Sequence, residues 1–330
     1  MTTQFTPTRR ALGWLAGAAL LAHLGSPAWA QGFPAKPIRL VVAFAPGSGN
    51  DSTARELARH MGETLGQPIV VENRAGAGGS IGTDVVAKAA PDGYTIGLGT
   101  SSQLVMNVGL YKSLPFDVDK DLRAIGLVSR TPLVLVAGAA SPASLADLIA
   151  LAKANPGKLS YGSAGMGSIS HIVAEAFAQA ADITLLHVPY KGNAAALIDL
   201  AGGQVNLVFD GFLSSVPLAR QGRARMLAVS REQRSSLEPQ LPTFAELGLR
   251  DFQAYTWNNL FAPAKTPQDI IDKLNAALNK ALALPALRDR LAQSASESLA
   301  PSTPAQADAF GQAERARWVP FVRGLRIELN

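Results

Sequence analysis

Two glycine-rich segments contain the residues of this chain that are best suited to hold a ligand. Residues 45–51 read Ala-Pro-Gly-Ser-Gly-Asn-Asp and residues 165–168 read Gly-Met-Gly-Ser, and each segment joins an expected strand to an expected helix. Glycine lets backbone amides converge on a ligand, and a helix start presents free N–H groups at the positive end of its dipole. The segments therefore fit a carboxylate cage, and they fit tight turns without a ligand equally well.

The residues that we expect to contact a ligand lie in these segments or directly after other expected strands. They are Gly47, Ser48, Gly49, Asn50, Asp51, Ser101, Ser163, Gly165, Met166, Gly167, Ser168, Tyr190 and Asp210. Asp51 has a second interpretation, because it stands where a helix N-cap belongs. Trp257 also has two interpretations: it could line the cleft, or it could pack inside the hinge. Neither segment has the P-loop lysine or the three spaced glycines of a dinucleotide site, which disfavours nucleotides.

The residue types that would indicate catalysis or metal binding are not arranged for either role. A serine nucleophile needs a sharp turn and a base within reach, and the chain's Gly-x-Ser-x-Gly at residues 78–82 has no histidine local to it. We interpret His171, the one histidine local to an expected loop serine, as a helix-start or packing residue. The chain has no cysteine, no histidines four apart and no calcium-type loop. We therefore expect no enzyme activity, metal or cofactor, and keep a secreted hydrolase as an alternative.

Hydrophobic runs and turn residues predict the elements that position these segments. Strands rich in β-branched residues alternate with amphipathic helices, which indicates parallel sheets with helices on their faces. Ligands bind beyond the carboxyl ends of strands in such sheets. The first unit has strands expected at 38–44, 69–71 and 94–99. The second has strands expected at 124–137, 159–162, 184–188, 205–209 and 226–229.

The end of the chain suggests how the two units are connected. Residues 251–261 look extended, and the chain is helical from residue 267, with a final helix over 304–322. These last helices have no strands of their own, so we expect them to pack on the first unit. The chain would then cross between units near 124–136 and near 252–260. Two crossover strands form a hinge, and the cleft between hinged lobes can hold a small ligand.

The first 30 residues predict export. Arg9 and Arg10 precede an apolar run over 11–24, and Ala28-Trp29-Ala30 has the small residues that signal peptidase requires. The run is shorter than a membrane span, so we expect cleavage after Ala30 and no membrane anchor. The arginine pair fits both the Sec and the twin-arginine export systems.

Composition excludes some partners. The formal net charge is +5 and no run of basic residues occurs, so nucleic acid is not an expected partner. Without cysteine the exported protein has no disulfide and depends on its core. Nothing in the sequence requires more than a monomer.

The sequence resembles the Bug family, the extracytoplasmic receptors of tripartite tricarboxylate transporters, over nearly all of the chain after the leader. The motifs together are specific, although each alone is weak. They are residues 36–42 (Lys-Pro-Ile-Arg-Leu-Val-Val), 44–47 (Phe-Ala-Pro-Gly), 71–74 (Val-Glu-Asn-Arg), 90–94 (Ala-Pro-Asp-Gly-Tyr), 155–161 (Asn-Pro-Gly-Lys-Leu-Ser-Tyr), 187–192 (His-Val-Pro-Tyr-Lys-Gly) and 202–205 (Gly-Gly-Gln-Val).

The resemblance implies an α/β, two-lobed periplasmic binding protein fold of type II-like architecture. Each lobe would be a mainly parallel sheet flanked by helices, with residues 31–130 and 255–330 in one lobe and 131–254 in the other. It further implies a periplasmic receptor that captures a small carboxylate and delivers it to membrane transporter subunits. A receptor of the same fold that feeds a signalling partner remains an alternative.

Two residues depart from the family pattern. Ser48 interrupts the glycines that commonly follow Ala-Pro, and Met166 stands where Asn is common. An apolar side chain in place of an amide donor could shift the ligand towards a less polar acid, which is our hypothesis.

Overall fold

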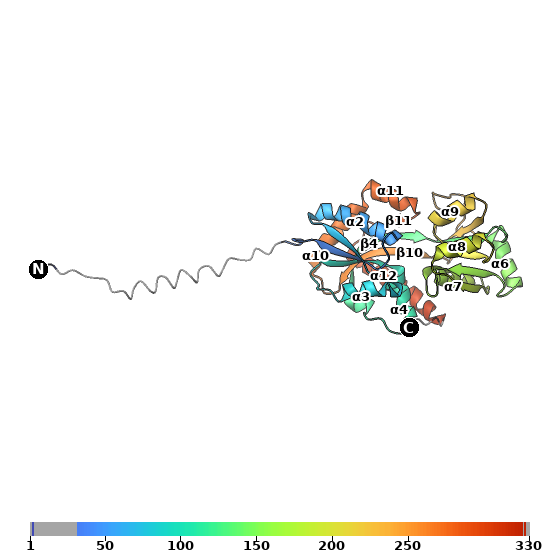
Figure 1. Ribbon diagram of the computed structural model, residues 1–330, viewed down its shortest axis with the longest axis horizontal. Helices are drawn as coiled ribbons and strands as arrows, with labels where there is room; N and C mark the ends of the chain where they lie inside the picture. Colours follow the sequence, from blue (N-terminus) through green and yellow to red (C-terminus); the bar gives the residue numbers. More distant parts are fainter. Residues whose placement is uncertain (1, 3–31, 326, 328–330) are drawn as a thin grey trace. The chain divides into compact units, whose positions relative to one another are not determined.

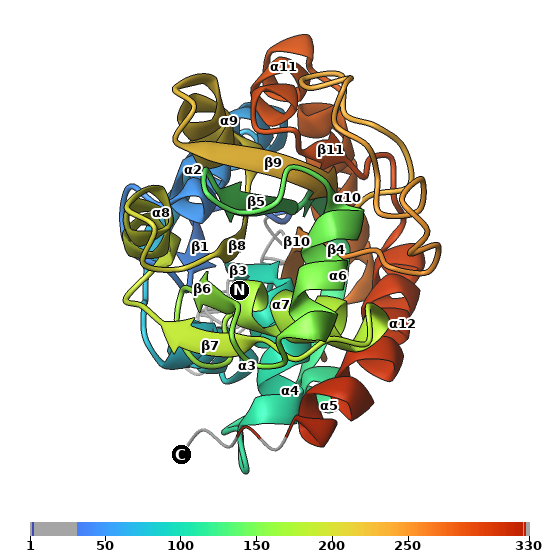
Figure 2. The same cartoon turned by 90° about the vertical axis from the view of Figure 1, so that its right-hand side faces the viewer.

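The computed structural model describes residues 2, 32–325 and 327, so the expected leader lies outside the described residues apart from residue 2. The chain divides into two units, Met1–Ala35 and Lys36–Asn330, and both sheets belong to the second unit. Within this second unit the sheets are separate layers with their own helices, which confirms the α/β, two-lobed fold (Figures 1 and 2).

The first sheet has six strands in the spatial order β11-β4-β10-β3-β1-β2. β1 pairs in parallel with β2 and β3, whereas β10 is antiparallel to β3 and β4. The sheet is therefore mixed, because the strands that connect the lobes run against their neighbours. In chain order its strands are β1 (Ile38–Val42), β2 (Ile69–Asn73), β3 (Thr95–Thr100), β4 (Leu122–Pro132), β10 (Tyr255–Pro263) and β11 (Glu297–Ser298).

Helices from both ends of the described chain pack on the first sheet. α10 contacts α2, and α12 contacts β4, which confirms that the last helices pack on the part of the fold that contains the first sheet. The helical segments are α2 (Gly49–Leu65), η1 (Ala77–Gly79), α3 (Ser80–Ala87), the π-helical η2 (Ser102–Met106), α4 (Asn107–Leu110), α5 (Val118–Asp121), α10 (Gln268–Leu282), α11 (Pro285–Gln293) and α12 (Pro304–Gly324).

The second sheet has five strands in the order β7-β6-β8-β5-β9. β6 is parallel to β7 and β8, and β5 is antiparallel to β8 and β9. The strands are β5 (Val134–Gly138), β6 (Ser160–Ser163), β7 (Leu186–Pro189), β8 (Leu207–Asp210) and β9 (Ala224–Val229). The helices are α6 (Leu145–Ala154), α7 (Ile169–Ala180), α8 (Asn193–Ala201) and α9 (Phe212–Arg220).

The long strand expected over 124–137 is two strands, β4 and β5, which are separated by Leu133 and belong to different sheets. The return crossing lies between β9 and β10. Ser230, which is fully buried, links the two crossings. Its Oγ accepts from the Leu133 amide at 2.8 Å and donates to the Ala254 carbonyl at 2.5 Å. Ser230 thus holds the two crossings together at Leu133, and no sequence pattern pointed to it.

Strand directions decide which loops face the space between the sheets. β4 runs towards the second sheet, because β5 follows it directly. β10 is antiparallel to both β4 and β3, so β3 and its parallel partner β1 also run that way. In the second sheet β5 starts at the edge nearest the first sheet, and β8 and β6 end there. The carboxyl ends of β1, β3, β6 and β8 therefore face one another across the gap.

Candidate ligand-binding site

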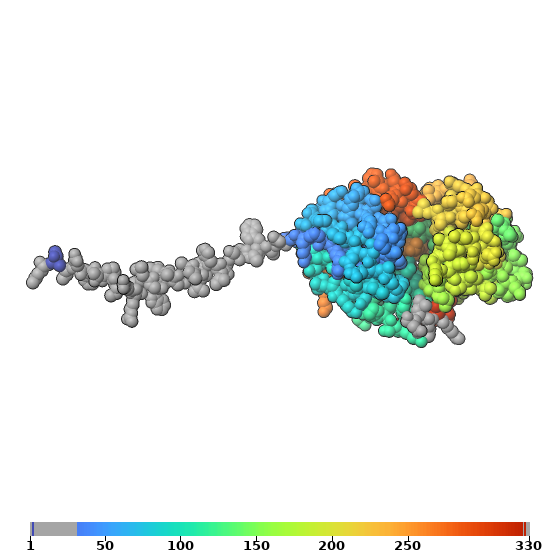
Figure 3. Space-filling view, in the orientation of Figure 1, coloured from blue at the N-terminus to red at the C-terminus, as the bar shows by residue number. Residues whose placement is uncertain are grey.

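A furrow separates the surfaces of the two lobes in the space-filling view (Figure 3). One side is formed by the blue and cyan part of the chain and the other by the yellow and green part. The expected ligand residues lie at or after the carboxyl ends of β1, β3, β6, β7 and β8. Four of these strand ends face the opposite sheet, and β7 is parallel to its neighbour β6. We take this region as the candidate site.

The loops after β1 and after β6 have the same backbone turn. The Ser48 amide donates to the Ala45 carbonyl at 3.2 Å, and the Ser168 amide donates to the Gly165 carbonyl at 3.1 Å. The third residue of each turn is glycine with positive φ, 80° at Gly47 and 73° at Gly167. A left-handed residue at this position is what a type II turn requires, and glycine adopts it without strain.

Both turns lead into the same helix start. Ser48 and Ser168 are the N-caps, with φ/ψ of −68°/161° and −65°/158°. Each serine hydroxyl accepts from the amide three residues later, which belongs to Asp51 in α2 and to His171 in α7. The expectation that Asp51 caps the helix is wrong in detail, because the helix begins at Gly49 and Ser48 is the cap.

The side chain at the third helical position completes each motif by reaching back to the turn glycine. The Gly47 amide donates to Asp51 Oδ2 at 2.9 Å, and the Gly167 amide donates to His171 Nδ1 at 3.0 Å. Asp51 and His171 are therefore equivalent residues of two copies of one loop. The spacing Gly-Ser-x-x-Asp and Gly-Ser-x-x-His was the signal in the sequence, although no repeat of fixed period exists.

This arrangement decides which amides can reach a ligand. The amides of Gly47 and Gly167 are used within the loops. Helix geometry leaves the first amides of a helix without intrahelical partners, and those of Gly49, Asn50, Ile169 and Ser170 donate to no other described residue. We therefore expect two backbone amides from each loop to bind the ligand, at the positive ends of two helix dipoles.

Asp51 is held as an anion by its surroundings. It is almost fully buried and accepts from Arg55 Nε at 3.0 Å, from Asn73 Nδ2 at 2.9 Å and from Gly47. These hydrogen bonds, that from Arg55 first, lower the pKa of the carboxyl to about 2. With both oxygens bonded inside the protein, Asp51 organises the loop and its charge is compensated by Arg55.

A stack of aromatic rings supports the second loop. The rings of His171 and His187 are parallel with centroids 3.9 Å apart, and the Tyr161 ring lies 4.9 Å from His187 and 6.2 Å from His171. His187 Nε2 is 2.7 Å from Ser163 Oγ. Desolvation, and then the neighbouring His187, lower the pKa of His171 to about 4, and desolvation lowers the pKa of His187. Both imidazoles are therefore neutral at pH 7.

This stack also bears on the hydrolase alternative. Ser163 and His187 form a serine–histidine contact that sequence reasoning missed. However, Ser163 is fully buried, and its hydroxyl also contacts the Gly165 amide and carbonyl. His171 receives a hydrogen bond from its own loop. Neither histidine is thus placed to activate a serine that a substrate can reach.

The remaining expected residues differ in what they can offer a ligand. Ser101 is buried after β3 and its hydroxyl has no hydrogen-bond partner among the described residues. The Tyr190 hydroxyl donates to Asp199 at 2.8 Å, so it is engaged elsewhere. Asp210 accepts from Asn193 Nδ2 at 2.7 Å, and Met166 is 52% exposed. Ser101 and Met166 are the two side chains of this group that are free of such bonds.

Asparagine side chains that the sequence reasoning missed fasten both loops. Asn73 Nδ2 donates to the Phe44 carbonyl, and Asn193 Nδ2 donates to the Phe209 carbonyl. Asn258 of the crossover strand β10 donates to Asn50 Oδ1 at 2.9 Å. Asn73 and Asn258 lie in strands and Asn193 is the first residue of α8, so no common position in the sequence marked them. These hydrogen bonds attach the loops to the neighbouring strands.

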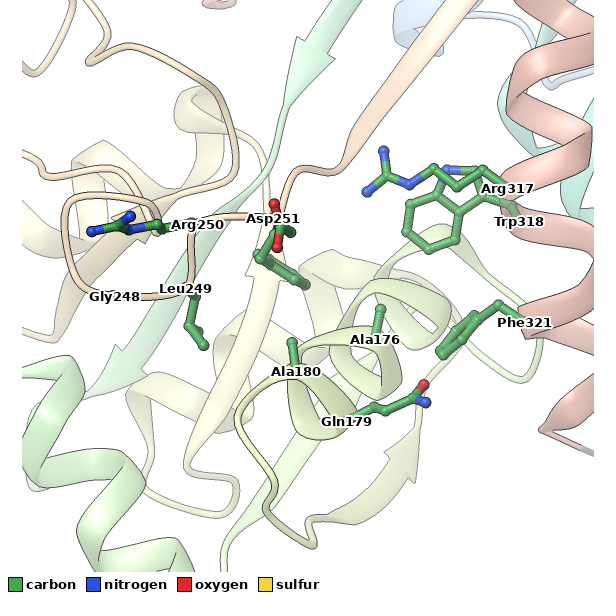
Figure 4. Close-up of a pocket in the computed structure, with 11 residues that line it drawn as sticks. Ala176, Gln179, Ala180, Gly248, Leu249, Arg250, Asp251, Arg317, Trp318 and Phe321 are labelled. Carbon is green, nitrogen blue, oxygen red and sulfur yellow. The ribbon is translucent and has the colours of Figure 1, made fainter.

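A separate cavity of about 460 Å³ lies elsewhere in the fold (Figure 4). It is lined by α7, by the segment 248–252 and by α12, whose Arg317, Trp318 and Phe321 point towards it. None of the expected ligand residues lines it. In the described part of the chain, no group of three or more potential ligands is placed to bind a metal. No described helix is both long and apolar enough to cross a membrane.

The histidine stack predicts an acid-sensitive stability. The pKa of His171 falls from 6.5 to about 4 on folding, so the unfolded state binds more protons between these values. The free energy of unfolding should then be constant above about pH 6.5 and fall as the pH drops towards 4, by on the order of 3 kcal/mol at most from this residue. Urea unfolding across this range measures it. His171→Phe should flatten the slope, and equal slopes would contradict the prediction.

Several known proteins are similar to this chain in sequence or in structure. Residues 53–327 match the family model described as the tripartite tricarboxylate transporter family receptor. The chain is 40% identical to protein BugT of Bordetella pertussis over 312 residues, 94% of this chain and 95% of that protein. It is similar to the structure of MatC from Rhodopseudomonas palustris with bound malate, at 33% identity, 88% and 100% coverage and a TM-score of 0.76.

A second solved structure, Rpa4515 of the same organism with adipate, is 33% identical. The match covers 88% of this chain and 98% of that one, with a TM-score of 0.77. With a family model that spans most of the sequence and a relative matched almost from end to end, this chain belongs to the tripartite tricarboxylate transporter receptor family.

Proposed function

We propose that this protein is a periplasmic receptor that captures a small carboxylate between its two lobes and delivers it to a tripartite transporter. The observation that carries the proposal is the pair of matching turn–helix loops after β1 and β6, which face each other and each offer two free amides. Two amides at a helix start suit one carboxylate. The malate and adipate in the structures of MatC and Rpa4515 support a ligand of this class.

Closure of the lobes would complete the site. We propose lobes formed by residues 31–130 with 255–330 and by residues 131–254, joined at Leu133 and at the segment before β10. A ligand shifts such a protein towards the closed form only by the extra contacts that it makes there. A carboxylate bound by both loops has these contacts, whereas one loop alone gives none. Residues 1–30 would be the export signal, and the mature protein would act as an unanchored monomer without catalytic activity.

Met166 suggests a preference within this ligand class. The side chain is exposed on the second loop and carries no hydrogen-bond donor. We expect a protein lacking residues 1–30 to bind aliphatic or aromatic mono- and dicarboxylates more tightly than citrate. Calorimetric titration with adipate, malate, benzoate and citrate tests this, supported by thermal shift, since saturation at 100 times Kd stabilises by about 2.7 kcal/mol.

The matched variant is Met166→Asn, which restores the amide common in the family. It should bring the affinity for the more polar acids closer to that for adipate without changing the melting temperature by more than a few degrees. If the unaltered protein clearly prefers citrate, the predicted preference for less polar acids is wrong. If it binds no acid at all, the proposed function is wrong.

A further inference from the structure

We propose that His171 is a positioning residue of the ligand site: as a neutral imidazole it accepts the Gly167 amide, and it thereby sets the direction in which the Ile169 and Ser170 amides face the ligand. The inference rests on the proposed function and adds a residue that does not itself touch the ligand.

The first step is the equivalence of His171 with Asp51. Both occupy the third position of a helix that starts after a type II turn, and both accept the amide of the residue before the cap. In an ordinary capping box a Glu or Gln at this position bonds the cap's own amide. Here the cap amide instead closes the turn, and the preceding glycine is bonded. The side chain at the third helical position therefore fixes the orientation of the turn relative to the helix.

The second step is the protonation state that this role requires. An amide can donate only to an unprotonated ring nitrogen, so Nδ1 of His171 carries no proton and Nε2 carries one. The groups that face the ring favour this state. His187 stacks on it at 3.9 Å and Tyr161 lies 6.2 Å away, with the Tyr161 hydroxyl bonded to Glu175. Two stacked imidazolium ions would repel each other.

The third step is the difference between the two loops. A carboxylate organises the first loop and is balanced by Arg55, with 3.0 Å between the charged atoms. A neutral ring organises the second. The second loop therefore presents its amides with no anion attached to the turn, which suits the charged end of a ligand. Ser170 reinforces this loop, because its Oγ accepts from the Ala164 amide at 3.0 Å and donates to Asn193.

Three substitutions at one position separate these roles. His171→Phe keeps an aromatic ring against His187 and removes the acceptor. His171→Asn places an amide oxygen close to the position of Nδ1 and removes the ring. His171→Asp keeps an acceptor and adds a negative charge. Each variant is titrated with adipate, or with the acid that binds the unaltered protein most tightly, and its melting temperature is measured without ligand.

We expect His171→Phe to lose about tenfold or more in affinity. A loop amide that is turned away loses its hydrogen bond to the ligand carboxylate, and one charge-assisted hydrogen bond contributes about this much. His171→Asn should stay within about threefold of the unaltered protein even if it melts lower. His171→Asp should bind more weakly than His171→Asn, because its charge opposes the ligand. This order of affinities is independent of the order of stabilities, which a purely structural role would follow.

The dependence of affinity on pH gives a second readout. As the pH falls from about 6 towards 4, the affinity of the unaltered protein should drop more steeply than that of His171→Asn, which has no proton to gain at this position. If the unaltered protein binds an acid and His171→Phe binds it equally well, the inference is wrong. If the unaltered protein binds no acid at all, the proposed function fails instead.

Discussion

Gly49→Pro should weaken carboxylate binding by about 10- to 100-fold while leaving the protein folded. Gly49 is the first residue of α2, where its amide has no intrahelical partner. α2 begins in the loop after β1, whose carboxyl end faces the second sheet. Proline is well tolerated at this position, and the Ser48 backbone at φ −68° and ψ 161° already has the conformation that precedes proline. The substitution thus removes one N–H and little else. A hydrogen bond to a charged group contributes about 1.5–3 kcal/mol.

Gly49→Ala is the matched control. It keeps the amide, and a Cβ at this position meets no atom within 4 Å. We expect its affinity within about threefold of the unaltered protein and a similar melting temperature for all three proteins. Calorimetric titration with the tightest-binding acid measures the difference. Equal losses in both variants would show that the side chain obstructs the ligand, and no loss in either would remove this amide from the site.

Trp257→Ala should be among the most destabilising single changes, with a loss of about 3–5 kcal/mol in the free energy of unfolding. Trp257 lies in β10 with 1% of its surface exposed, and its ring meets Phe310 of α12 edge-on at 5.3 Å. Nε1 donates to Glu314 Oε2 at 2.9 Å. Burial raises the pKa of Glu314, so the substitution leaves both a cavity and a buried carboxyl without its partner.

Trp257→Phe separates the two contributions, because it retains most of the ring and removes the donor. We expect it to cost less than half as much as the alanine variant in urea unfolding. Since the side chain packs between β10 and α12, ligand affinity of the folded fraction should stay within a few-fold in both variants. A variant of normal stability that binds no ligand would instead place Trp257 in the wall of the cleft, the other interpretation that its sequence position allowed.

Much of the fold could be predicted from the order of the residues. β-branched runs such as residues 38–42 predict strands because their side chains suit a pleated, buried surface. The return of the last helices followed from counting strands and helices. The sequence did not predict that both sheets contain antiparallel as well as parallel strands, because hydrophobicity indicates burial and not strand direction. Nor did it predict the contact that joins the two crossings, because Leu133 bonds Ser230, which lies 97 residues further along the chain.

The candidate site divides in the same way. Composition and spacing alone determined that two glycine-rich turns open two helices after strands, because glycine, serine and a helix period are local features. Only the tertiary structure decided which amides remain free, that Asp51 and His171 are equivalent, and that His171 stacks on His187 from a different element. These depend on how side chains meet across α7, β6 and β7, where a shift of about one hydrogen-bond length changes the partner, and no local spacing encodes that distance.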